Sequence, residues 1–196
     1  MRSPIGFAAS LVLLLAVPVA FASQLVVDES AELILHLTVG AGCILLAVAM
    51  FDFGLSRWVT WIGAAAAGAF GSIFLLQFVS GLVTSDALHA LAYGVLGQEI
   101  EGVLPYAMLI WFVALLLQGS SGKSRILGWV TISTVIGVEV LAIVGPSVGV
   151  QVESQKLLFL LPILWLLFES GKRRTEARPD ALTSEVVDRH PSGSAA

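Results

Sequence analysis

Residues 58–83 read WVTWIGAAAAGAFGSIFLLQFVSGLV, an apolar run that contains no charged side chain. About 20 apolar residues are enough for a helix to cross the hydrocarbon core of a bilayer. Glycine and alanine recur throughout the run, at Gly63, Gly68 and Gly71 among other positions. Small side chains of this kind let a second helix approach closely within a membrane. The run therefore predicts a transmembrane helix that uses its small residues for packing.

Similar apolar runs occur on both sides of this stretch. The chain of 196 residues is 57% hydrophobic and 12% charged, with a mean hydropathy of +0.94. This composition is typical of a polytopic helical membrane protein and leaves no room for a folded soluble domain. We predict an all-α bundle over residues 23–170, with five transmembrane helices at residues 31–51, 58–83, 103–117, 126–145 and 157–168.

The first apolar run, residues 7–22, has the pattern of a secretory signal peptide. Arg2 precedes a short apolar core, and Ala20, Phe21 and Ala22 form a small-residue cleavage signal before Ser23. This tripartite pattern predicts that residues 1–22 are removed after Ala22. The alternative is an uncleaved first helix, which would give six helices. Both interpretations place Ser23 outside.

The ten lysine and arginine residues predict the orientation of the bundle. If the runs alternate in direction, nine of the ten lie on one side and Lys156 alone lies on the other. Positive charges near span ends mark the cytoplasmic side. The mature N-terminus is therefore expected outside a plasma or inner membrane, with the C-terminus in the cytoplasm. Residues 171–196, which are polar and rich in mixed charge, predict a disordered cytoplasmic tail.

Residues 84–102 do not fit this alternation of spans. A helix over residues 86–96 would be about 16 Å long at 1.5 Å per residue, roughly half the hydrocarbon thickness. Both neighbouring runs place this segment on the outer face, which predicts an interfacial or re-entrant helix. It is either a cap over a site within the bundle or an amphipathic connection that lies among the lipid headgroups.

Two histidines are predicted at similar depth near the outer leaflet. His36 lies in the run 31–51 and His89 in the outer-face segment, whereas His190 lies in the tail on the opposite side. Two imidazoles from different helices can supply both axial ligands of haem b. His36 and His89 are thus candidate cofactor ligands, and we interpret the chain as a small membrane binding or electron-transfer module.

Two alternatives involve the acidic residues near these histidines. A divalent metal could bind to a mixed set of imidazoles and carboxylates. Its candidate ligands are His36, His89, Glu32, Asp86, Glu99 and Glu101. The simpler alternative is that Glu32 pairs with His36 at i, i+4 and that Asp86 lies beside His89, with no cofactor bound.

Glu139 is a second candidate, because a carboxylate in the run 126–145 is costly in hydrocarbon. Such residues often line proton or ion paths and substrate sites, or else serve as protonated bridges between helices. Its predicted partners are Gln77, Thr131, Ser133 and Thr134. Two other acids, Asp52 and Glu169, are expected at the inner interface, where they would be solvated or paired with Arg57 and Lys172.

The sequence gives little support for other function classes. Ser72, Ser80 and Ser133 lack a G-x-S-x-G context, and zinc-protease, Walker and dinucleotide signatures were not found, so enzyme activity is not expected. The net charge of −4 argues against nucleic-acid binding. Expected partners are the lipid bilayer and either further copies of the chain or other membrane subunits. The remaining alternatives are an accessory subunit without a cofactor and a small channel or carrier that uses Glu139.

Overall fold

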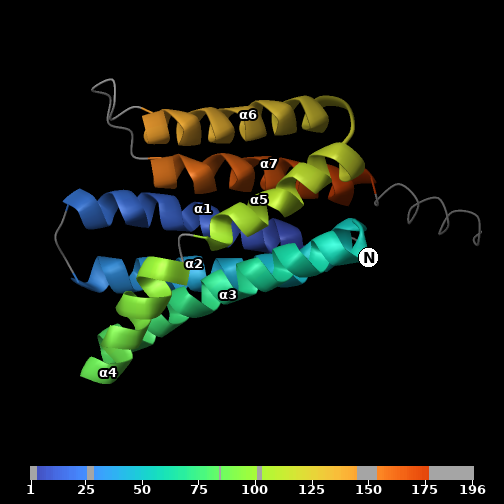
Figure 1. The fold of residues 1–196 in the computed structure, drawn as a ribbon. Helices are drawn as coiled ribbons and strands as arrows, with labels where there is room; N and C mark the ends of the chain where they lie inside the picture. The colour runs from blue at the N-terminus through green and yellow to red at the C-terminus, as the bar shows by residue number, and fades with distance from the viewer. Residues whose placement is uncertain (1–3, 26–28, 84, 101–102, 145–153, 177–196) are drawn as a thin grey trace, which may run out of the picture.

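The computed structural model describes residues 4–25, 29–83, 85–100, 103–144 and 154–176, and every regular element within these ranges is helical (Figure 1). Elements η2 and η3 are π-helical, and η1 is a short 3₁₀ helix. The order is α1 (Pro4–Leu25), α2 (Glu29–Ala49), η1 (Met50–Phe53), α3 (Arg57–Leu82), α4 (Asp86–His89), η2 (Ala90–Ile100), α5 (Leu104–Ala114), η3 (Leu115–Gly119), α6 (Gly122–Val144) and α7 (Ser154–Glu176).

Three helical stretches within the described residues are long and apolar enough to cross a membrane. They are Ser30–Phe53, Arg57–Leu82 and Gly122–Leu141. Two shorter apolar stretches, Pro4–Ala16 and Leu104–Gly119, accompany them. The predicted all-helical class is therefore confirmed. The length and composition of these three helices are compatible with a membrane location.

The long helices pack in the order α6, α7, α1, α2, α3, and α5 lies against α3 (Figure 1). Helix α1 thus has a neighbour on each side. Its side chains at Ala9, Ser10, Leu13 and Ala16 are buried, as expected for a helix between α2 and α7. Cleavage after Ala22 remains a prediction, but it would remove a helix whose buried residues form part of the core.

The glycines of α3 confirm the packing role that the sequence predicts for the run 58–83. A Cβ atom on Gly71 would lie 2.8 Å from the carbonyl oxygen of Gly40 on α2. A Cβ atom on Gly63 would lie 2.7 Å from the Cβ atom of Trp111 on α5. These two glycines let α2 and α5 approach the backbone of α3.

The segment between α3 and α6 consists of two helical halves. The first half, α4 with η2, folds back along α3, and the second half, α5 with η3, begins about midway along the bundle (Figure 1). Residues 86–96 are therefore helical as predicted, but the helical segment extends to Ile100 and packs against α3. Its location on the outer face stays a prediction. The predicted run 103–117 corresponds to α5 and η3.

Candidate histidine site

His36 lies in α2 with its side chain turned into the bundle, and only 7% of the residue is exposed. Its ring meets the edge of Phe74 on α3, with ring centroids 5.6 Å apart. On the η2 side, the hydroxyl oxygen of Tyr93 lies 3.4 Å from Nδ1 of His36. The buried imidazole therefore contacts both elements that pack beside it.

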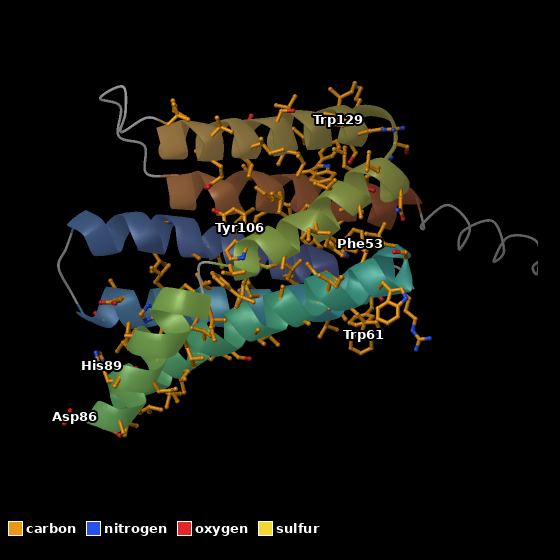
Figure 2. All side chains as sticks on the ribbon, in the orientation of Figure 1. Phe53, Trp61, Asp86, His89, Tyr106 and Trp129 are labelled. Carbon is orange, nitrogen blue, oxygen red and sulfur yellow. The ribbon has the colours of Figure 1, made fainter. Side chains whose placement is uncertain are left out.

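His89 lies at the end of α4 and is exposed (Figure 2). Its ring stacks on Tyr93, with centroids 4.5 Å apart and planes tilted by 33°. The centroid of the same tyrosine ring lies 5.9 Å from that of His36. One aromatic side chain thus contacts both histidines, and we call Glu32, His36, Phe74, His89 and Tyr93 the histidine cluster.

A buried amide holds η2 in this position. Gln77 of α3 is only 4% exposed, and its Nε2 atom donates a hydrogen bond to the carbonyl oxygen of Ala92, at 3.5 Å. Ser80 donates in turn to the carbonyl oxygen of Gln77, at 2.8 Å. Gln77, predicted as a partner of Glu139, therefore connects η2 to α3.

Two of the four carboxylates that were predicted as metal ligands, those of Glu32 and Asp86, have side chains among the described residues. Oε1 of Glu32 lies 3.9 Å from Nε2 of His36, as the i, i+4 spacing predicts, and its side chain is 60% exposed. Asp86 is exposed at the start of α4 (Figure 2). The Glu99 side chain and the whole of Glu101 lie outside the described residues. Within those residues, no three His, Cys, Asp or Glu side chains converge on a metal position. The mixed metal site remains a prediction.

Tyr93 is the member of the cluster that sequence reasoning missed. It follows His89 by four residues, and residues four apart lie on the same face of an α-helix. The spacing of His89 and Tyr93 was therefore enough to predict their contact. The contact of Tyr93 with His36 could not be predicted from spacing, because it depends on how η2 packs beside α2 and α3.

Glu139 has a different partner from those predicted. The Tyr106 hydroxyl on α5 donates a hydrogen bond to its Oε2 atom, at 3.0 Å. Thr134 instead donates to the carbonyl oxygen of Val130 in its own helix, at 2.8 Å. Glu139 therefore joins α6 to the beginning of α5.

Of the two expectations for Glu169, solvation or pairing with a cation, the structure contradicts solvation. Only 2% of the residue is exposed, and its Oε2 atom accepts a hydrogen bond from the Ser124 hydroxyl. The indole Nε1 of Trp165 donates to the same serine oxygen, at 3.2 Å. Close packing of α6 on α7 at Gly128, whose Cβ would meet the Trp165 ring, encloses this group.

The pattern G-x-S-x-G does occur once, at residues 145–149, which read GPSVG and contain Ser147. They lie outside the described residues, with α6 before them and α7 after them. A nucleophile elbow connects a β-strand to a helix, so the flanking elements do not supply its context.

Comparison with protein-family models, with curated proteins and with solved structures finds no match to this chain.

Proposed function

We propose that this chain is an integral membrane protein with six crossings, of which the segment from α4 to η3 is one discontinuous crossing. The beginnings of α3 and α6 and the end of α7 carry Arg57, Lys123 and Lys172, respectively. Helices that alternate in direction bring these three positions to one end of the bundle. The positive-inside rule makes that end cytoplasmic. The histidine cluster then lies at the outer end.

The burial of α1 supports its retention as the first crossing. Loss of residues 1–22 would expose apolar faces of α2 and α7, which α1 now covers. We expect protein purified from membranes to have an intact mass that includes Arg2 and the residues after it. A mass that begins at Ser23 would contradict retention and support signal-peptide cleavage.

We further propose that the outer end binds haem b through His36 and His89. The observation that carries this proposal is that both imidazoles, from helices far apart in sequence, contact the same tyrosine ring. A haem needs only two axial nitrogens. A divalent metal usually needs a larger set, which the described residues do not bring together. Two imidazoles therefore suit haem better than they suit a metal alone.

The hydrogen-bond partners suggest how each histidine would act. The Tyr93 hydroxyl lies within hydrogen-bond distance of Nδ1 of His36, which leaves Nε2 as the nitrogen that would bind the haem iron. Glu32 is largely exposed, so its carboxylate can move away from Nε2. His89 is exposed on a four-residue helix, and its ring would have to turn away from Tyr93 to help hold the haem.

Titration of the purified protein with haemin tests this function. We expect a saturable shift of the Soret band at one haem per chain, because both ligands come from a single chain. His36→Ala should abolish the shift, whereas His190→Ala in the tail should leave it intact. An unshifted Soret band, or an equal shift in His36→Ala, would contradict haem binding. That result would favour an accessory subunit that uses the histidines only for packing.

A further inference from the structure

A second candidate site lies between α1, α2, α5, α6 and α7. It is a pocket between helices that are distant in sequence, and its walls are almost entirely apolar. Each of five helices contributes to the lining, which includes Leu13 of α1, Cys43 of α2, Phe112 of α5, Val135 of α6 and Ile163 of α7. Tyr106, at the beginning of α5, also lines it.

The polar edge of this pocket is the hydrogen bond between Tyr106 and Glu139. Tyr106 is 50% exposed, so the pocket reaches the surface of the bundle at this residue. Val135 and Glu139 are four residues apart on α6 and therefore share a face, which brings the carboxylate next to the lining. Tyr106 lies about midway along the bundle, where the discontinuous crossing resumes (Figure 2).

The chemistry of this edge favours a cationic ligand. A carboxylate within a membrane needs a hydrogen-bond donor or a positive charge nearby. Tyr106 supplies a neutral donor, and the described residues show no cationic side chain within salt-bridge distance of Glu139. Half of the tyrosine is exposed, so the position opens toward lipid rather than toward water if the bundle is membrane-inserted.

We infer that this pocket binds a lipid-soluble amine, with the ammonium group on Glu139 and Tyr106 and the apolar chain along Val135, Phe112 and Cys43. The inference rests on the membrane placement proposed above and is independent of haem. Charge complementarity selects the head group, and the apolar lining selects the chain. A neutral alcohol would satisfy the hydrogen bond but not the charge, and a fatty acid would place two carboxylates together.

Binding of radiolabelled dodecylamine to the full chain in lipid nanodiscs tests this inference. We expect saturable binding of one amine per chain above that of empty nanodiscs. Glu139→Gln should lose most of it, because the charge is removed while the shape is retained. Val135→Trp should lose it by filling the pocket. Gly137→Ala is the matched control on α6, since a Cβ atom there meets nothing within 4 Å, and it should bind like the wild type.

Three outcomes would overturn the inference. They are binding no greater than that of empty nanodiscs, unchanged binding by Glu139→Gln, and equal competition by dodecanol and dodecylamine. Failure of the wild type to enter nanodiscs would count against the membrane proposal, and so against the placement that the inference needs. A folded, inserted protein that binds no amine would count against the pocket assignment only.

Discussion

Replacing Gly71 by alanine is expected to lower the melting temperature of the protein in detergent, whereas the same change at Gly68 should leave it nearly unchanged. The two glycines lie one turn apart on α3, so helix propensity changes equally in both. A Cβ atom at Gly71 would lie 2.8 Å from the Gly40 carbonyl oxygen and 3.1 Å from the Cβ atom of Cys43. Relief of that contact requires movement of the α2 backbone.

The loss of stability depends on which atom the new Cβ atom would contact. Overpacking in a close contact costs about 1–3 kcal/mol. At Gly68 the nearest atom would be the Cβ of Ala47, at 3.9 Å, which is an ordinary contact. Thermal unfolding of both variants, followed by loss of the monodisperse peak in size-exclusion chromatography, measures the difference. Equal melting temperatures for the two variants would show that α2 and α3 are not packed through Gly71.

Replacing Glu169 by alanine is expected to produce the second large loss of stability. The substitution leaves a cavity and deprives the Ser124 hydroxyl of its acceptor in a buried site. An unsatisfied buried polar group costs about 1–3 kcal/mol, and the cavity adds to this. Glu169→Gln retains the shape and one acceptor oxygen, so it should lose less.

Asp52, an exposed acid near the same end of the bundle, provides the control for Glu169. Asp52 in η1 is exposed, and Asp52→Ala should change the melting temperature little, because surface substitutions usually change stability by less than about 0.5 kcal/mol. The same thermal unfolding assay applies to all three variants. If the melting temperatures of Glu169→Ala and Asp52→Ala are both close to that of the wild type, the buried hydrogen bond to Ser124 contributes nothing to stability.

Composition and the length of the apolar runs were enough to predict the helices. Apolar runs reveal helices of membrane length because the hydrocarbon core sets a minimum span. The small residues around Gly71 indicated close packing because side-chain size alone limits how near two helix backbones can come. Both features are local. The structure confirms close packing at Gly71, and among the described residues it shows three helices long and apolar enough to cross a membrane.

Contacts that depend on how the helices pack against one another could not be predicted from local sequence. The chain reversal after α3 brings Tyr93 to His36 and Ala92 to Gln77, and these contacts join residues that are far apart in the sequence or on different elements. The burial of Glu169 depends on α6 lying against α7, and near a span end the sequence gives the same pattern for a buried acid as for a solvated one. Glu139 was recognised as costly, but its donor is an exposed tyrosine at a helix start, whose distance in sequence hides the pairing.

Haem binding between His36 and His89 can be tested with a reduced-minus-oxidised absorption spectrum of protein purified from its own membranes without added haemin. We expect the sharp α-band and Soret band of six-coordinate haem b in the wild type, and their loss in His36→Ala and in His89→Ala. A wild-type spectrum without these bands, or bands that persist in both variants, would contradict it.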